Sequence, residues 1–173
     1  FEELWNEKEL LVSFDSMCIM NPPNKGGNID SISWLHVDQG PKKKGLQCIQ
    51  GFVNLEETTE NDGSMIIIPG SHKYHSGMFK KNGKIFNQDW YKLKDDDIKY
   101  IDNLKLKNKR LIIPKGAMVL WDSRTIHCNC YPTNKSTNFR YVVYVCMTPK
   151  KWCNNFNLKK RIKAFEENRM TTH

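Results

Sequence analysis

Two histidines and one aspartate carry the most specific chemical signal in the sequence. His36 and Asp38 are separated by one residue, so in a strand their side chains point to the same face. His127 lies much further along the chain and follows the apolar run Met118–Trp121. Two imidazoles and one carboxylate can occupy one face of an octahedral metal ion and leave other positions open, which is the ligand set of non-haem Fe(II) oxygenases. The spacing therefore predicts a metal site formed by His36, Asp38 and His127.

Arg140 is the residue most suited to hold an anion near such a site. It lies near the start of the apolar run Phe139–Met147, which is the clearest strand prediction in the sequence. A guanidinium inside a β-core is costly unless it pairs with an anion, and its planar fork matches a carboxylate. A dicarboxylate co-substrate that chelates the metal with one end would supply that anion with the other. The alternative is that both histidines are ordinary core or surface residues and that Arg140 faces solvent.

The elements that must position these residues are predicted to be short strands. Apolar, β-branched segments favour strands over residues 10–20, 29–37, 46–55, 65–68, 110–113, 117–122, 124–130 and 139–147. Helical patterns occur mainly at the ends, over residues 1–8 and 150–169, and more weakly over 94–101. Many short strands with helices at the ends indicate an antiparallel sandwich or barrel, and periodicity alone does not choose between them.

The 173 residues are expected to form a single domain over 1–173. Residues 71–109 are polar and rich in lysine, and we predict a lid-like insertion that leaves the core, because loops longer than ~12–15 residues in compact domains are usually functional. No apolar run approaches the ~18–20 residues of a membrane span, and the first residues lack the basic and apolar pattern expected of a signal peptide. The chain starts at Phe1 rather than Met, so we expect that an N-terminal part of the parent protein is absent.

Net charge and cysteine content bear on the partner of the protein and on its cellular location. The formal net charge is +8, from 27 Lys+Arg and 19 Asp+Glu. The lysines are scattered over several loops rather than gathered in one stripe, so a nucleic-acid partner is the less favoured alternative to a small-molecule substrate. The six cysteines lie mostly in apolar runs and form no CxxC pair, so we expect reduced thiols and an intracellular, cytoplasmic location.

Four segments follow one another in a distinctive order, namely WLHVDQ (34–39), VNLEETTENDGSMIIIPGSHK (53–73), PKGAMVLWDSRTIH (114–127) and FRYVVYV (139–145). The opening ELLVSFD (9–15) and the closing RMTTH (169–173) add to the pattern. These segments extend over nearly the whole chain. Through them the sequence resembles the phytanoyl-CoA dioxygenase-like (PhyH) family of Fe(II)/2-oxoglutarate-dependent oxygenases. The resemblance implies a mainly β fold, the double-stranded β-helix or cupin-like jelly roll, with flanking helices.

The resemblance also implies a site and an activity. His36, Asp38 and His127 would be the catalytic Fe(II) ligands, and Arg140 would bind the distal carboxylate of 2-oxoglutarate. In many relatives the arginine follows the second histidine after fewer residues. Here the loop 129–138 between them is longer. The implied reaction uses O2 to hydroxylate a C–H bond of a small organic substrate, with decarboxylation of 2-oxoglutarate to succinate and ascorbate as an additional reductant. The alternatives are the same chemistry on a macromolecule, either nucleic acid or a protein side chain, and a non-catalytic metal-binding jelly-roll module.

Three polar residues are further candidates for contact with the co-substrate. Gln50 and Asn54 alternate with Phe52 along one predicted strand and so share a face. A polar outer face is the equally supported alternative for that strand. Asn129 lies two residues after His127 and shares its face.

Three other residues are candidates for the substrate pocket. Trp34 lies two residues before His36 and is expected on the metal side, although plain core packing is the alternative. His72, in the PGSHK turn, is expected near the mouth of the site. It either contacts the substrate or only fixes the turn. Arg124 follows Asp122 closely, and a structural ion pair between them is favoured over a contact with substrate.

Overall fold

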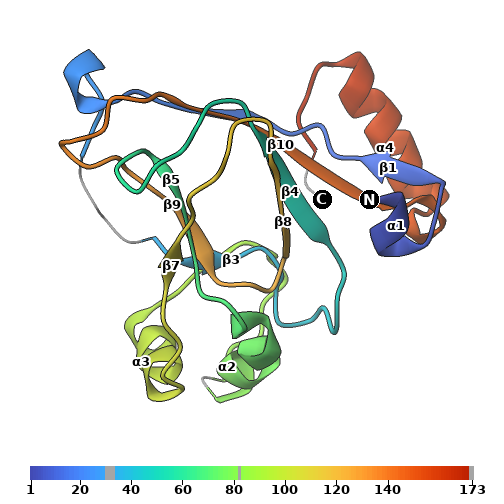
Figure 1. Cartoon of the computed structure of the whole chain (residues 1–173). Coiled ribbons are helices and arrows are strands. Elements are labelled where there is room, and N and C mark those ends of the chain that lie inside the picture. Colours follow the sequence, from blue (N-terminus) through green and yellow to red (C-terminus); the bar gives the residue numbers. More distant parts are fainter. Residues whose placement is uncertain (30–33, 82, 172–173) are drawn as a thin grey trace.

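The computed structural model describes residues 1–29, 34–81 and 83–171. Within these ranges the strands form two five-stranded sheets in which every pairing is antiparallel (Figure 1). The first sheet contains β1 (Leu10–Val12), β2 (Met17–Met20), β4 (Ile49–Asn54), β8 (Met118–Asp122) and β10 (Arg140–Pro149). The second contains β3 (His36–Val37), β5 (Ser64–Ile67), β6 (Tyr91–Lys92), β7 (Lys109–Arg110) and β9 (His127–Cys130).

The chain winds between the two sheets as it advances. Strands β3, β5 and β9 belong to the second sheet, whereas β4, β8 and β10, which follow them in turn, belong to the first. This alternation is the winding of a double-stranded β-helix, so the predicted cupin-like jelly roll is confirmed. Phe52 and Val142 of the first sheet and Met65 of the second are at most 2% exposed and form the core between the sheets.

Four α-helices flank the sheets in the described residues: α1 (Glu2–Trp5), α2 (His75–Lys81), α3 (Asp95–Asn103) and α4 (Asn155–Glu166). Figure 1 shows α1 and α4 beside β1, while α2 and α3 lie together at another end of the molecule, near β3. The side chain of Asn154 caps α4 by accepting a hydrogen bond from the backbone N–H of Asn157 at 2.8 Å. None of the described helices has the length and apolar character needed to cross a membrane.

The lysine-rich segment 71–109 differs from its prediction because it does not leave the core. Met78 and Phe79 of α2 and Ile101 of α3 are at most 3% exposed, and they pack with Val37 of β3 in one apolar cluster. Apart from Lys84, the lysines of this segment are exposed. The predicted role as a lid stays a prediction.

Several predicted boundaries also differ. The run 10–20 forms two strands rather than one, because the chain bends between Ser13 and Ser16 while both strands pair with the same edge of β10. The segment predicted over 29–37 is described only at residue 29 and from residue 34, and only His36–Val37 is a strand there. Helix α2 was not predicted, since Gly77 within it lowers helix propensity.

Candidate metal centre

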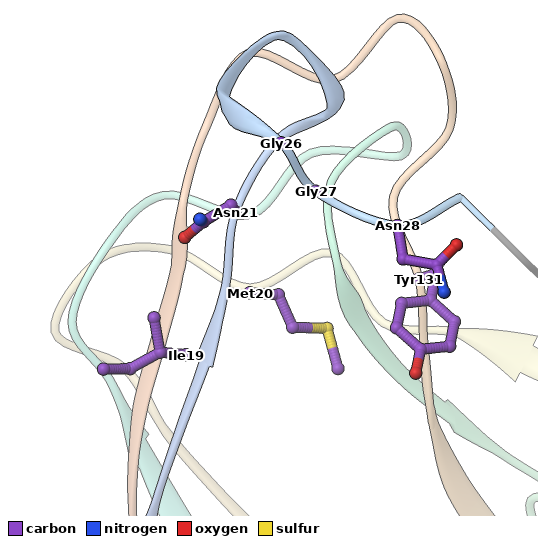
Figure 2. A pocket seen from close by; sticks show the side chains of 7 residues that line it. All are labelled: Ile19, Met20, Asn21, Gly26, Gly27, Asn28 and Tyr131. Atoms are coloured by element: carbon purple, nitrogen blue, oxygen red, sulfur yellow. The ribbon is translucent and has the colours of Figure 1, made fainter.

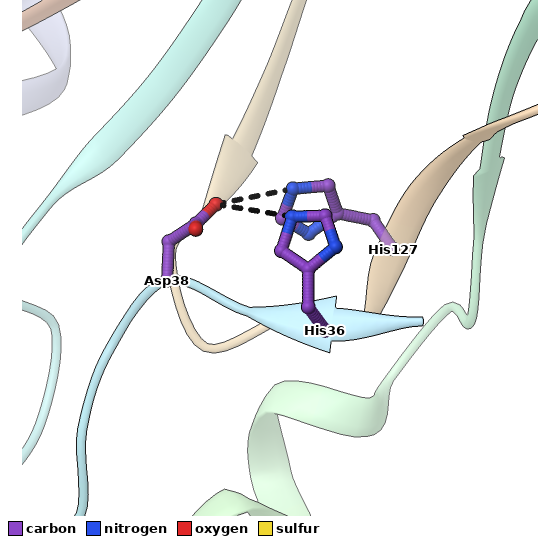
Figure 3. A group of neighbouring side chains, drawn as sticks. All are labelled: His36, Asp38 and His127. Atoms are coloured by element: carbon purple, nitrogen blue, oxygen red, sulfur yellow. Dashed lines mark ion pairs between the residues drawn. The ribbon is translucent and has the colours of Figure 1, made fainter. Parts of the chain in front are cut away.

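His36 and His127 are brought together by the pairing of β3 with β9. The two residues are directly opposite in the register, and their ring centroids are 4.3 Å apart. Asp38 lies just after β3, and its carboxylate turns back toward both imidazoles (Figure 3). The Oδ2 atom of Asp38 is 3.7 Å from Nε2 of His36 and 3.2 Å from Nε2 of His127. The three predicted ligands therefore converge, with one ligand atom from each within 4.8 Å of the others.

Both imidazole rings are oriented by backbone carbonyls. Nδ1 of His36 is 3.1 Å from the carbonyl oxygen of Trp34, and Nδ1 of His127 is 2.8 Å from that of Thr125. Since a carbonyl only accepts, each Nδ1 carries the proton and each Nε2 keeps its lone pair for a metal. This second contact of a ligating histidine is the usual way in which proteins fix its tautomer.

The protonation states also suit metal binding. Burial, aided by the nearby His127, lowers the pKa of His36 to about 4, so its ring is neutral at pH 7. Burial alone would raise the pKa of Asp38, but the two nearby imidazoles, His127 before His36, and the hydrogen bond from the amide of Gln50 lower that pKa to about 2. A neutral imidazole and an ionised carboxylate are the forms that bind a divalent cation.

Further hydrogen bonds hold the ligands in place. Gln50 Nε2 donates to Asp38 Oδ2 at 3.0 Å, and the backbone N–H of Asp38 donates to the carbonyl of Ser123 at 2.9 Å. The hydroxyl of Ser71 accepts from the N–H of Ile126 at 2.8 Å, immediately before His127. The PGSHK turn thus positions the second histidine, and Gln50 contacts Asp38. The predicted contact of Gln50 with the co-substrate stays a prediction.

Arg140 is the other notable group in the space between the sheets. Its side chain is only 1% exposed, and its guanidinium lies over the ring of Phe52, 5.5 Å from the centroid. Nη1 donates to Sγ of Cys18 at 2.8 Å and Nη2 donates to Oδ1 of Asn129 at 3.0 Å. No carboxylate pairs with Arg140 in the part of the chain that the structure describes. A buried cation without an anion is costly, so this position suits an anionic ligand.

Two aromatic residues that were not predicted also belong to the site. The ring of Trp121 lies 5.2 Å from that of His127, and its Nε1–H is buried without a hydrogen-bond partner in the described structure. The hydroxyl of Tyr144 accepts from Nδ2 of Asn129 at 3.0 Å, on the face of β10 that carries Arg140. Strand parity identifies both, because Tyr144 lies four residues after Arg140 and Trp121 faces Gln50 in the register.

Asn54 does not take its predicted place beside a co-substrate. Its Nδ2 donates to the carbonyl oxygens of Glu56, Ile113 and Pro114 at 2.6, 2.9 and 3.3 Å, and the side chain is fully buried. These bonds satisfy carbonyls of two turns, so the Asn54 amide has no N–H left for 2-oxoglutarate. Strand parity could not predict these hydrogen bonds, because two of the three carbonyls, those of Ile113 and Pro114, lie far from Asn54 in the sequence.

The residues predicted for substrate contact lie in different surroundings. Trp34 stacks on His36 with ring centroids 4.8 Å apart, so it does lie on the metal side. Arg124 forms a two-pronged ion pair with Asp122, in which Nη2 and Oδ2 are 2.5 Å apart, and this is the favoured structural alternative. His72 is half-buried in the turn Ser71–Tyr74. Trp90, from the lysine-rich segment, was not predicted, and its ring lies 5.6 Å from that of His36.

A small pocket of about 380 Å³ lies away from this centre, next to β2 (Figure 2). Its lining includes Met20, Asn21 and Tyr131 and contains no Lys, Arg, Asp, Glu or His. Gly27 in its wall permits a close approach of the backbone, because a Cβ there would lie 1.9 Å from the carbonyl oxygen of Asn21. The pocket offers no metal ligand, and the converging side chains of Figure 3 remain the candidate site.

The fold and the site together define a jelly-roll domain with a His–Asp–His group that could hold a metal ion. The family model of phytanoyl-CoA dioxygenase (PhyH) matches residues 2–140, so the chain belongs to the PhyH family. The Ava biosynthesis cluster protein O of Aspergillus versicolor is 33% identical over 181 residues, covering 100% of this chain and 58% of that protein.

Solved structures agree on the fold. EctD from S. alaskensis with 2-oxoglutarate and 5-hydroxyectoine superposes with a TM-score of 0.58 at 14% identity, over 87% of this chain and 48% of EctD. The epimerase SnoN in complex with Fe3+, alpha ketoglutarate and nogalamycin RO gives 0.55 at 15% identity, over 86% and 53%. The chain thus spans roughly half the length of these proteins.

Proposed function

We propose that this chain is the catalytic region of an Fe(II)- and 2-oxoglutarate-dependent dioxygenase that hydroxylates a C–H bond of a small organic substrate. One arrangement carries the proposal. Asp38 Oδ2 lies 3.7 and 3.2 Å from the Nε2 atoms of two histidines whose Nδ1 atoms are already engaged, and a buried arginine with no carboxylate partner among the described residues lies between the same two sheets.

The spacing of the side chains suits a short dicarboxylate. Gln50, which contacts Asp38, and Phe52, which lies under the guanidinium of Arg140, are successive inward residues of β4. Successive inward residues of a strand are about 7 Å apart, which is comparable to the length of a five-carbon diacid. A 2-oxoglutarate molecule bound to the metal at its keto-acid end can therefore reach Arg140 with its other carboxylate.

The residues present fit Fe(II) by their chemistry, since two imidazoles and one carboxylate leave open positions on an octahedral ion. When bound, Fe(II) supplies the redox chemistry that couples decarboxylation of 2-oxoglutarate to oxidation of a C–H bond by O2. The side chains hold and orient the reactants. His36, Asp38 and His127 would bind the metal, Arg140 and Asn129 would orient the distal carboxylate, and the orphan N–H of Trp121 is available to a carboxylate oxygen.

Membership of the PhyH family supports this activity, and EctD and SnoN show that proteins of this fold have been crystallised with 2-oxoglutarate. We also propose that residues 71–109 wall the substrate site, which is supported by the contact between Trp90 and His36. An intracellular location belongs to the same proposal, and the six cysteines are free in the structure.

A thermal-shift experiment separates a functional centre from a vestigial one. Mn(II) together with N-oxalylglycine, an inert analogue of 2-oxoglutarate, should raise the melting temperature, because a ligand that binds only the native state stabilises it. His36→Ala should abolish this increase. An equal increase in both proteins, or none in the wild type, would contradict the proposed site.

Turnover is tested by a substrate screen under air with Fe(II), 2-oxoglutarate and ascorbate. The expected result is succinate formation that depends on substrate, together with a product heavier by one oxygen atom. Succinate formation driven by a protein or an oligonucleotide and by no small molecule would replace the small-molecule substrate with a macromolecular one. Analogue binding without any turnover would indicate a binding module.

A further inference from the structure

A second pocket, of about 750 Å³, is not lined by the metal ligands. It lies between β1, the C-terminal end of β10 and helix α4, which Figure 1 shows side by side. Its wall includes Ser13, Cys146, Thr148, Trp152, Arg161 and Ala164.

This pocket is adjacent to the candidate catalytic site. Cys146, in its wall, faces Gln50 in the register of β10 and β4, and Gln50 donates to the carboxylate of Asp38. On the opposite side the wall contains Asp89, the neighbour of Trp90, whose ring lies 5.6 Å from that of His36. Gln50 on one side and Trp90 on the other thus link the pocket wall to the metal ligands.

The opening and closing motifs of the sequence meet at this pocket. The N–H of Phe14 donates to Oγ1 of Thr171 at 2.9 Å, and the N–H of Thr171 donates to the carbonyl of Phe14 at 3.0 Å. Ser13 and Thr171 both line the pocket. Two segments at opposite ends of the chain, neither of which supplies a metal ligand, thus join to build one wall.

The wall carries more positive than negative charge. Its cations are Lys43, Lys160, Arg161 and Arg169, and its only acid is Asp89. Asp89 pairs with Lys43 at 2.7 Å, and Arg169 pairs with Glu167 at 2.6 Å. Arg161 and Lys160 pair with no carboxylate among residues 1–29, 34–81 and 83–171.

The guanidinium of Arg161 is held in a fixed orientation although no carboxylate of the described residues pairs with it. Its Nη2 donates to the carbonyl of Val12, and its guanidinium lies over the ring of Phe14, 4.8 Å from the centroid. A guanidinium that is already oriented loses little conformational entropy when it binds a carboxylate or phosphate with its free N–H groups.

Ser13 gives an independent sign of a ligand. The residue is only 9% exposed and lines the pocket, yet its hydroxyl has no hydrogen-bond partner in the described structure. Buried hydroxyl groups nearly always have a partner, so an orphan group in a pocket wall points to a polar group of a bound molecule.

We infer that this pocket binds the substrate through an oxyanion, a carboxylate or a phosphate ester, which pairs with Arg161 while Ser13 bonds a polar group of the same molecule. The inference rests on the proposed function, because it identifies the pocket as the place from which the substrate reaches the metal centre. It adds the chemical class of the substrate.

The test measures binding of phenyl phosphate, benzoate and neutral benzyl alcohol by calorimetry at constant ionic strength, with Mn(II) and N-oxalylglycine present. At least one of the two anions should bind clearly more tightly than benzyl alcohol, and their order distinguishes a phosphate from a carboxylate substrate. Arg161→Gln should weaken anion binding roughly tenfold or more, since a hydrogen bond to a charged group contributes about 1.5–3 kcal/mol. Ser13→Ala should weaken it by a smaller factor.

The matched control is Lys159→Gln, which removes the same charge from the same helix at an exposed residue outside the pocket. Its binding constants should stay within about twofold of the wild type. If Arg161→Gln unfolds the protein, Arg161→Lys keeps the charge and should lose affinity because the planar fork is absent. Equal binding of benzyl alcohol, no loss in either Arg161 variant, or an equal loss in Lys159→Gln would overturn the inference.

Two measurements on the wild type keep this inference separate from the proposed function. Arg161-dependent anion binding in a wild-type protein that shows no response to Mn(II) and N-oxalylglycine would support the pocket and contradict the dioxygenase. A normal response to Mn(II) and N-oxalylglycine without Arg161-dependent anion binding would support the dioxygenase and overturn the inference about the pocket.

Discussion

His36 and His127 face each other across β3 and β9, and each ring bonds through Nδ1 to the carbonyl oxygen two residues earlier in its own segment, at 3.1 and 2.8 Å. Both Nε2 atoms are thereby directed at Asp38. The sheet supplies the pairing of the two histidines, and the backbone supplies their orientation. The metal site is thus largely formed before any ion binds.

Gln50 is expected to act as a positioning residue for Asp38. Removing its Nε2–H in Gln50→Ala should weaken Mn(II) binding about 10- to 100-fold, which is the usual effect of losing an outer partner of a metal ligand. Electron paramagnetic resonance of free Mn(II) measures this affinity. Gln88→Ala, at an exposed position, should leave the affinity unchanged. An affinity in Gln50→Ala equal to that of the wild type would show that the hydrogen bond has no such role.

Arg140 is expected to serve ligand binding rather than stability. In Arg140→Met the unliganded protein should melt at the same or a higher temperature, because a buried cation without a described acid partner is replaced by an apolar chain. The variant should still bind Mn(II) but should lose the additional stabilisation by N-oxalylglycine. Thermal shift with each ligand added in turn measures both effects.

Arg124 provides the contrast to Arg140. Arg124→Met breaks the ion pair with Asp122 and leaves that carboxylate alone, so it should destabilise the protein by about 1–3 kcal/mol while the response to N-oxalylglycine persists. If Arg140→Met instead unfolded the protein while Arg124→Met did not, Arg140 would be a structural residue.

The convergence of three side chains could be predicted, because strand parity puts His36 and Asp38 on one face and the family resemblance adds His127 to them. The fate of Asn54 could not, since its amide is used by carbonyls of Ile113 and Pro114, far along the chain. Trp121 was not predicted for a different reason. Its pairing with Gln50 across β8 and β4 and the lack of a partner for its N–H are both visible only in three dimensions.

The lysine-rich segment shows the limit of composition as a guide. Its charges suggested an excursion from the core, yet Met78, Phe79 and Ile101 are spaced so that one face of each helix is apolar and packs on β3. Inside it, Lys84 and Asp97 form a buried ion pair at 2.7 Å that no local pattern reveals. A few apolar residues on the inner faces of the helices are enough to pack the segment on the sheet, although its overall composition is polar.

The unpartnered Nε1–H of Trp121 is expected to donate to the bound co-substrate. Trp121→Phe keeps most of the aromatic packing, so the free energy of unfolding should change little, whereas the affinity for N-oxalylglycine should fall about fivefold to tenfold. Trp5→Phe is the matched control, because Nε1 of Trp5 already donates to the carbonyl of Met147 at 2.7 Å. That variant should lose about 1 kcal/mol of stability and bind the analogue normally. The reverse pattern would assign the Trp121 N–H no role in binding.

Asp62 is expected to hold the long loop that separates His127 from Arg140. Its buried carboxylate accepts from the N–H of Thr59 at 2.9 Å, from Oγ of Ser136 at 2.7 Å and from Nδ2 of Asn138 at 3.1 Å. Burial would raise the pKa of Asp62, but these hydrogen bonds prevail and lower it below its ordinary value. The carboxylate thus ties the loop to the turn that precedes β5.

Because the folded-state pKa of Asp62 is depressed, its contribution to stability is present above the unfolded pKa of about 3.9 and is lost as the pH falls through the lower folded-state value. Asp62→Asn should therefore reduce the free energy of unfolding by about 2–4 kcal/mol at pH 7 and flatten its decline below pH ~4. Urea titrations across this range measure both effects. Asp15→Asn, at an exposed position, should change stability by less than about 0.5 kcal/mol. A decline in acid as steep in Asp62→Asn as in the wild type would place the responsible carboxylate elsewhere.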